Sequence, residues 1–156
     1  MMKSLRLVLG DQLTHSLSAL DGLDPAQDVV FMADVAQEIT YVPHHKQKIV
    51  LILSAMRHFA EELISEGLQL HYVRLNYPAN TGSFTSELAR AIALHQPDRI
   101  IATEPGEWRV AQMMGEWSAQ FGLPLDIREN NSFFCSRGRF ARWADERKSY
   151  ELARFV

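Results

Sequence analysis

The sequence predicts an α/β fold, a Rossmann-like, doubly wound sheet of five parallel strands with helices on both faces. Short apolar segments alternate with longer segments of helical periodicity, and short connections join them. Strands that alternate with helices pair in parallel, because each helix returns the chain to the end where the previous strand began. Right-handed crossovers then place helices on both faces, and we expect the strand order 3-2-1-4-5.

The first predicted strand, Leu5–Leu9, runs directly into the polar tip Gly10-Asp11-Gln12. An apolar run that ends in glycine and an acid is typical of a buried strand with a turn at its carboxyl end. Ligands of open α/β sheets bind just beyond the carboxyl ends of strands, so Asp11 is a candidate binding residue. A purely structural role is equally compatible, because aspartate also caps helices and turns.

Two further elements are expected before the longest helix. Thr14 or Ser16 can cap a short helix that ends near Leu20. The apolar run Asp28–Ala33 is predicted to be the second buried strand. A longer polar connection, residues 37–43, follows it.

The longest helix is predicted over residues 45–66. Its apolar residues recur at helical spacing and are Ile49, Ile52, Leu53, Met56, Phe59, Ala60 and Leu63. Charged residues fall largely on the other side, so the helix should pack by one face. Gly67 is well placed to end it, because glycine readily adopts the left-handed conformation found after helix C-termini.

The second half of the chain repeats this alternation. Alternating polarity predicts a strand, helical spacing predicts a helix, and glycine or proline marks their ends. The elements expected are a strand at 68–75, a helix from Gly82-Ser83 to about His95, a strand at 99–103, a helix at 107–121 and a strand at 125–128.

The fourth strand has a polar tip of its own, residues 104–109, which contains Glu104, Gly106 and Glu107. In the expected order the first and fourth strands are neighbours, so Asp11 should lie near these carboxylates. Glu107 also has a structural interpretation, because a carboxylate is favourable at a helix N-terminus. Two adjacent strand tips with carboxylates predict one pocket, suited to a heterocycle with N–H donors.

Composition and spacing exclude several function classes. The net charge of -3 gives no global nucleic-acid footprint. Neither the glycine spacing of a dinucleotide-binding turn nor a phosphate-binding Gly-Lys-Ser/Thr sequence occurs, so dinucleotides and nucleoside triphosphates bound in the usual way are not expected. His44-His45 are adjacent and diverge on a helix, so we expect no metal site, and no catalytic centre is indicated.

The expected location is the cytoplasm. A single cysteine, Cys135, excludes an internal disulfide and indicates a reducing compartment. The N-terminal residues lack the pattern of a signal peptide, and the longest apolar run, Ile49–Leu53, is too short to span a membrane. We therefore expect a soluble domain with no membrane contact.

The character of the chain changes after Arg128, and we divide it into an α/β domain, residues 1–130, and a basic, aromatic segment, residues 131–156. The aromatic side chains of the segment are Phe133, Phe134, Phe140, Trp143 and Phe155, and its basic ones are Arg137, Arg139, Arg142, Arg147 and Lys148. Its helical pattern continues to Val156 without a stop signal, so we expect a missing part of a longer protein to cover it. Contact with phosphate backbone, a solvated helix face and an interdomain contact remain open.

Four segments, taken in order, are distinctive: Leu7–Thr14, Tyr41–Lys48, Ser54–Ala60 and Thr103–Arg109. Together they resemble the N-terminal domain of the deoxyribodipyrimidine photolyase-related proteins, the bacterial iron–sulfur cryptochromes and (6-4) photolyases. The resemblance covers essentially the whole chain. It implies a light-harvesting domain of a photolyase/cryptochrome-like DNA repair flavoprotein, whose antenna chromophore in characterised members is 6,7-dimethyl-8-ribityllumazine.

The resemblance also implies what this chain lacks. FAD, a [4Fe-4S] cluster and the damaged-DNA site would belong to a missing C-terminal helical domain, for which residues 131–156 begin the linker. The parent protein would be a DNA photolyase, a lyase that acts on damaged DNA, whereas the chain alone would not be catalytic.

The pocket residues implied by the resemblance are Gly10, Asp11, Leu13, Glu38, Ile52, Glu104, Gly106 and Glu107. The carboxylates are expected to accept hydrogen bonds from the ring or from ribityl hydroxyls, and Ile52 to form an apolar wall. Two alternatives remain. One is a docking module with a vestigial pocket, motivated by the apolar side chains of residues 131–156. The other is a flavodoxin-like nucleotide-binding domain that takes FMN.

Overall fold

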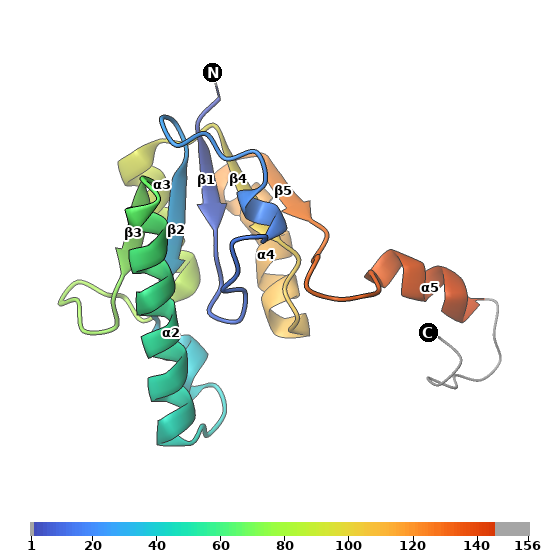
Figure 1. Ribbon diagram of the computed structural model, residues 1–156, viewed down its shortest axis with the longest axis horizontal. Coiled ribbons are helices and arrows are strands. Elements are labelled where there is room, and N and C mark those ends of the chain that lie inside the picture. Colours follow the sequence, from blue (N-terminus) through green and yellow to red (C-terminus); the bar gives the residue numbers. More distant parts are fainter. Residues whose placement is uncertain (1, 146–156) are drawn as a thin grey trace.

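The computed structural model describes residues 2–145 and contains the predicted five-stranded, all-parallel sheet in the order β3-β2-β1-β4-β5 (Figure 1). Every neighbouring pair of strands is parallel. The strands are β1 (Ser4–Leu7), β2 (Val29–Ala33), β3 (Leu70–Val73), β4 (Arg99–Thr103) and β5 (Leu125–Arg128). The predicted strand order is therefore confirmed.

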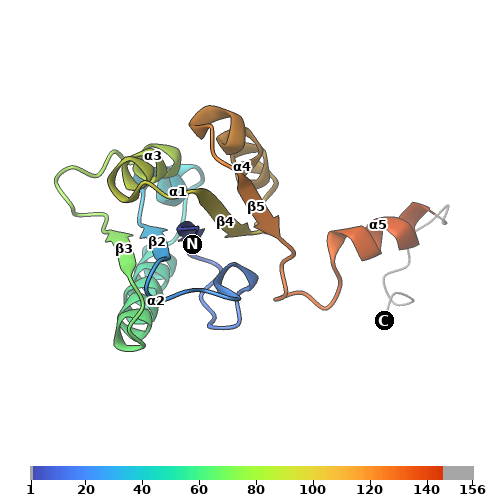
Figure 2. The ribbon, with the colours of Figure 1, turned by 90° about the horizontal axis from the view of Figure 1, so that it is seen from above.

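Helices cover both faces of the sheet, as predicted for a doubly wound fold. The helical elements are a 3₁₀ turn η1 (Ser18–Leu20), α1 (Ala36–Thr40), α2 (Lys46–Ser65), α3 (Phe84–His95), α4 (Trp108–Phe121) and α5 (Arg137–Asp145). Seen from above, α2 and the connection that contains η1 lie on one side of the sheet, and α3 and α4 lie on the other (Figure 2). Helix α5 projects away from these layers.

Two sequence predictions about connections are wrong. The segment from Thr14 to Leu20 forms only η1, and no side chain caps it. Tertiary contacts hold it instead, since the Ala19 N–H donates to the Thr103 hydroxyl at 2.9 Å. The polar connection 37–43 contains α1, a five-residue helix too short to show a periodic pattern.

Two predicted strands are longer than the observed ones. The apolar run to Leu9 continues past β1, but only the Val8 N–H extends the ladder, donating to the Phe31 carbonyl at 3.0 Å. The alternation over 68–75 likewise exceeds β3, where the chain pairs only with β2 at the edge of the sheet. Helix α5 begins inside the predicted C-terminal helix, whose continuation to Val156 lies outside the described residues. The division of the chain at residue 130 stays a prediction.

The core forms two layers, one on each face of the sheet. Alternating β2 side chains point to opposite faces: Phe31 joins the cluster under α3 and α4, whereas Val30 and Met32 join the cluster under α2. Trp117 of α4, fully buried, stacks on Phe84 of α3 with ring centroids 5.8 Å apart. These layers fix both groups of helices against the sheet.

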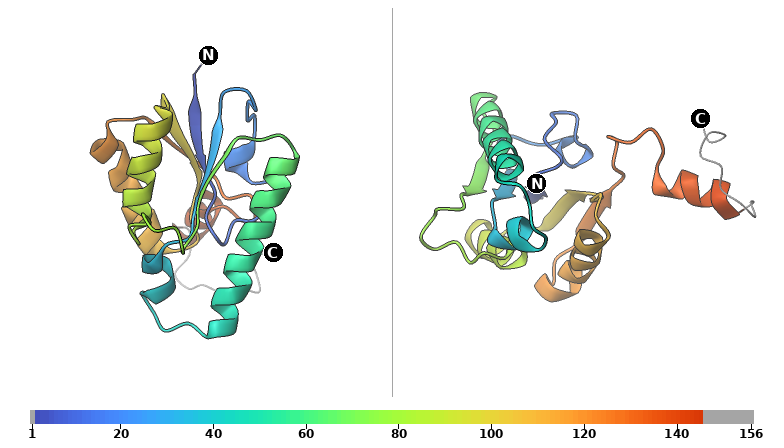
Figure 3. Two further views of the ribbon diagram at one scale, coloured as in Figure 1. Left: turned by 90° about the vertical axis from the view of Figure 1, so that its left-hand side faces the viewer. Right: turned by 90° about the horizontal axis from the view of Figure 1, so that it is seen from below.

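Helix α2 ends as predicted but is supported over only part of its length. Gly67 adopts the left-handed conformation (φ +83°), and the Leu68 N–H donates back to the Leu63 carbonyl at 3.1 Å. Met56, Phe59, Ala60 and Leu63 in its second half are buried, whereas Ile49 and Ile52 in its first half are only half-buried. That first half extends beyond the carboxyl edge of the sheet (Figure 1, and Figure 3, left). An apolar surface is therefore left facing the strand tips.

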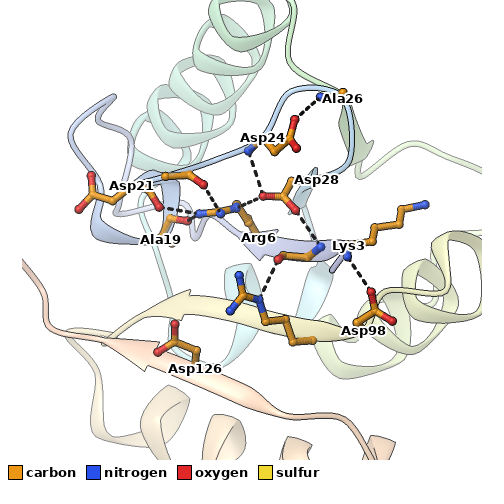
Figure 4. A network of polar contacts seen from close by, with 12 residues as sticks. Lys3, Arg6, Ala19, Asp21, Asp24, Ala26, Asp28, Asp98 and Asp126 are labelled. Carbon is orange, nitrogen blue, oxygen red and sulfur yellow. Dashed lines mark hydrogen bonds and ion pairs between the residues drawn. The ribbon is translucent and has the colours of Figure 1, made fainter. Parts of the chain in front are cut away.

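A buried ion pair ties β1 to the start of β2 (Figure 4). Arg6 and Asp28 are 1% and 3% exposed, and the Arg6 Nε donates to Asp28 Oδ2 at 2.7 Å. The other guanidinium nitrogens donate to backbone carbonyls of the connection between these strands, at Ala19, Asp21 and Gly22. Arg6 thus holds residues 19–22 of the connection against the sheet.

The Asp28 carboxylate is equally well satisfied. It accepts hydrogen bonds from the backbone N–H groups of Ser4 at 2.8 Å and Asp24 at 3.2 Å. Burial by itself would raise the pKa of Asp28, but these two bonds and Arg6 hold it below its ordinary value. The pair therefore stabilises the fold at neutral pH, and this contribution is lost in acid as the pH falls through the lowered pKa.

A second polar pair joins β3 to the end of α3. His71 Nδ1 and His95 Nε2 lie 2.7 Å apart, so one ring donates a hydrogen bond to the other. Burial, followed by the nearby positive charge of Arg90, lowers the pKa of His71. Burial, followed by His71 itself, lowers the pKa of His95. The folded state therefore favours the uncharged rings.

Asp28→Asn should lower the free energy of unfolding by about 3 kcal/mol, because it keeps the side-chain shape but leaves a buried arginine without its counter-charge. The matched control is Asp126→Asn, which removes the carboxylate of an ion pair with Arg128 that is about half exposed. That change should cost less than about 1 kcal/mol. Urea unfolding followed by circular dichroism measures both, and equal losses would contradict a dominant role for the buried pair.

The histidine pair should make stability fall as the pH drops from about 7.5 to about 5.5. Both folded-state pKa values are lowered, so the unfolded chain binds more protons in this range. Urea unfolding at the two pH values measures the change, which His95→Gln should reduce. The control, His58→Gln, alters an exposed ring and should leave the pH dependence intact. An unchanged dependence in His95→Gln would refute this assignment.

Candidate functional site

A cavity of about 300 Å³ lies at the carboxyl ends of β1, β2 and β4, where the sequence predicts a pocket. The uncovered first half of α2 forms one wall, with Ile49, Ile52 and Leu53. Val110 and Met113 of α4 contribute further apolar side chains. The cavity therefore has apolar walls at the edge of the sheet where open α/β folds bind their ligands.

Five of the eight predicted pocket residues line this cavity: Gly10, Asp11, Glu38, Ile52 and Glu107. Gly10 packs closely against α2: a Cβ atom there would lie 3.1 Å from the Met56 sulfur, so the methionine side chain would have to shift by a few tenths of an ångström. Residues predicted from the turn after β1, from the tip of β4 and from α2 therefore lie around one cavity.

The other three predicted residues do not line the cavity. Leu13 packs into the core under α2. The Glu104 carboxylate instead forms an ion pair with Arg137 at 3.1 Å. Gly106 lies beside the rim, since a Cβ atom there would be 3.7 Å from Asp11 Oδ2. The tip of β4 therefore faces the cavity through Glu107 and faces the start of α5 through Glu104.

Arg109 partners both glutamates at the mouth of the cavity. Its Nη1 and Nη2 donate to the two Glu38 carboxylate oxygens at 3.1 and 2.6 Å. Its Nη2 also donates to Glu107 at 3.3 Å, and the guanidinium lies over the Tyr41 ring, 4.3 Å from the centroid. The Tyr41 hydroxyl donates to Glu107 at 2.8 Å. Helix α1 and the start of α4 are thereby joined across the cavity.

Among residues 2–145, no cation forms an ion pair with Asp11, the third acid at this mouth. Burial of its carboxyl raises the pKa of Asp11, and the nearby charges of Glu107 and Glu38 raise it further, while its own backbone N–H opposes them. Lys48 also borders the cavity, and Arg109, which does not line it, pairs with Glu38 and Glu107. The mouth is thus rich in hydrogen-bond acceptors and unfavourable for a phosphate group.

Asp34 is a cavity residue to which sequence reasoning assigned no role. It directly follows β2 and is 2% exposed. Tyr72 donates to its Oδ1 at 2.8 Å, whereas Oδ2 is buried and has no hydrogen-bond partner among residues 2–145. The signal was present, because an acid directly after an apolar strand also identified Asp11. Three strand tips, not two, supply acids to the cavity.

Other kinds of site find little support in the part of the chain that the structure describes. No cluster of three or more histidine, cysteine, aspartate or glutamate side chains within residues 2–145 has an arrangement that could hold a metal ion. His45 instead caps α2, where its ring accepts from the Gln47 N–H at 3.2 Å. Within the same residues, no helix combines the length and apolar character needed to cross a bilayer.

Comparison with known proteins identifies relatives over nearly the whole chain. Residues 6–155 match the family described as deoxyribodipyrimidine photo-lyase-related protein. A (6-4) photolyase of Agrobacterium fabrum (strain C58) is 49% identical over 154 residues, which is 99% of this chain and 30% of that protein. The chain thus spans less than a third of the length of this curated relative.

Proposed function

Because this chain belongs to the deoxyribodipyrimidine photo-lyase-related family, we propose that it is the antenna-chromophore-binding part of a photolyase/cryptochrome-like DNA repair flavoprotein. The proposed chromophore is 6,7-dimethyl-8-ribityllumazine, which absorbs light and passes the excitation to reduced FAD. The observation that carries this proposal is the apolar cavity with an acidic mouth at the strand tips.

The cavity suits a fused heterocycle with a polyhydroxy chain. Its volume of about 300 Å³ is at the small end of the range of ligand sites. The apolar walls to which Ile52 and Val110 contribute are compatible with a ring system. Asp11, Glu38 and Glu107 at the mouth offer acceptors for ribityl hydroxyls.

Two observations disfavour the flavodoxin-like alternative, in which FMN would bind at the same edge of the sheet. No α-helix starts after β1, since the chain forms only η1 before β2. A helix N-terminus, the usual partner of a phosphate, is therefore missing at this turn. Asp11 occupies the position beside it, and its charge would repel the phosphate of FMN.

The docking alternative is compatible with chromophore binding, because it uses another surface. Phe133 and Phe134 are exposed in the segment before α5, and neither lines the cavity. We propose that the remainder of the full-length protein contacts this segment and contains FAD, a [4Fe-4S] cluster and the site for damaged DNA. The cluster needs four cysteine ligands, and this chain has one cysteine.

Titration of the full-length protein with 6,7-dimethyl-8-ribityllumazine, followed by ligand fluorescence, tests the proposal. We expect saturable one-to-one binding that Ile52→Trp weakens by about a hundredfold or more, because an indole fills part of a small apolar site. The matched control is Val50→Trp on the exposed side of the same helix, where the side chain is 66% exposed. It should bind like the unaltered protein.

Two further arms of this titration make it decisive. Glu38→Ala should also weaken binding, since it removes an acceptor and releases Arg109 at the mouth. FMN should bind less tightly than riboflavin, since the two differ only in the phosphate. Equal lumazine affinity of Ile52→Trp and Val50→Trp would reject this cavity as the chromophore site, and preferential FMN binding would favour the nucleotide-binding alternative.

A further inference from the structure

A groove of about 820 Å³ lies between β3 and α3. Its lining residues come from β3, from the loop that follows β3 and from α3, and none of them lines the cavity at the strand tips. Strands β3 and β5 form the two edges of the sheet, and α5 lies beyond the β5 edge (Figures 1 and 2). The groove is therefore a second concave surface, separate from the candidate site and from α5.

The backbone of β3 is open on the side of the groove. Strand β3 pairs with β2 alone, and the Val30 N–H of β2 donates to the Gln69 carbonyl at 2.8 Å. Backbone groups of successive residues point to opposite sides of a strand, so those of Leu70 and Tyr72 point to the open edge. An open edge of this kind can accept an additional strand.

The exposed charge of the groove is positive. The lining residues that carry a full charge at neutral pH are Arg74, Arg90 and Glu87. The Glu87 side chain is only 1% exposed and pairs with Arg90 Nη1 at 2.9 Å, whereas the Arg90 side chain is 42% exposed. Arg74 is exposed and forms no ion pair among residues 2–145. Carboxylates of an occupant would therefore meet two accessible guanidinium groups.

Exposed apolar side chains border the same groove. Leu94 of α3 is 68% exposed, and Tyr77, in the loop after β3, is 51% exposed. The Arg90 guanidinium lies over the Tyr77 ring, 5.9 Å from its centroid. Apolar contacts, cations and free backbone groups are thus combined along one strand edge, as a site for an extended peptide requires.

We propose that this groove is a docking site for an extended, acidic segment of a separate protein, which adds a strand to the sheet beside β3. The backbone of the segment bonds to the open edge, its carboxylates approach Arg74 and Arg90, and its apolar side chains contact Leu94. A second copy of this chain fits less well, because pairing two β3 edges would bring the same exposed arginines together. Duplex nucleic acid offers phosphates but no strand for the open edge.

Fluorescence anisotropy of labelled peptides with the full-length protein tests the proposal. The probe is a peptide of about ten residues in which glutamate and valine alternate. One counterpart carries lysine in place of each glutamate, and the other is the acidic peptide with every backbone nitrogen methylated. The acidic peptide should bind at least about tenfold more tightly than either counterpart, because one lacks the complementary charge and the other lacks the backbone donors.

Arg74→Glu reverses an exposed charge of the groove and should weaken binding of the acidic peptide by about tenfold or more. The matched control is Lys46→Glu, which makes the same change of charge at the exposed first residue of α2, outside the groove. The control should bind like the unaltered protein. Circular dichroism verifies that both variants are folded.

Several outcomes would overturn the inference. Equal binding of the acidic and lysine peptides would reject charge complementarity, and equal binding of the methylated peptide would reject strand addition. Failure of the full-length protein to bind the acidic peptide would show that a separate segment does not reach this edge, as when the rest of that protein covers it. Tighter, Arg74-dependent binding of a single-stranded oligonucleotide would assign the groove to nucleic acid, and a dimer that the acidic peptide dissociates would assign it to a second copy.

Discussion

The ion pair between Arg6 and Asp28 is the interaction on which the arrangement of this chain depends. Removing two charges from water is costly, and the cost is offset only when geometry and further hydrogen bonds are favourable. Here Arg6 also donates to three backbone carbonyls between β1 and β2, and Asp28 accepts two backbone N–H groups. The same connection begins with Gly10 and Asp11 at the cavity. The buried pair thus anchors the later part of the connection whose first residues border the candidate site.

Much of the fold follows from local patterns, whereas the cavity depends on contacts between distant residues. Apolar runs bounded by glycine and proline predict the five strands, and their alternation with helices predicts the strand order. The short elements η1 and α1 carry too few residues for any periodicity, and tertiary contacts determine them. Glu104 shows the limit of prediction for side chains. It lies four residues before Trp108, where α4 begins, and α4 contributes Val110 to the cavity, but the Glu104 carboxylate pairs with Arg137 outside the cavity.

Two of the acids at the mouth of the cavity already accept hydrogen bonds from protein side chains. Glu38 and Glu107 were expected to be free acceptors, yet Arg109 and Tyr41 already donate to them. A ligand hydroxyl that bonds to these carboxylates exchanges one hydrogen bond for another, and the net gain is small. The apolar walls gain contacts with a ligand without losing any. Affinity for a ligand therefore depends more on the interior of the cavity than on its charged mouth.

The first half of α2 extends past the sheet with its apolar side chains only half-buried. A helix segment with few buried contacts opens locally at a lower free-energy cost than the core. A molecule that occupies the cavity covers this surface, and by mass action it stabilises the closed helix. The rate of amide-hydrogen exchange in the first half of α2 should therefore fall as the fraction of occupied cavities rises. Exchange in this part of the helix thus reports how much of the protein has a ligand bound.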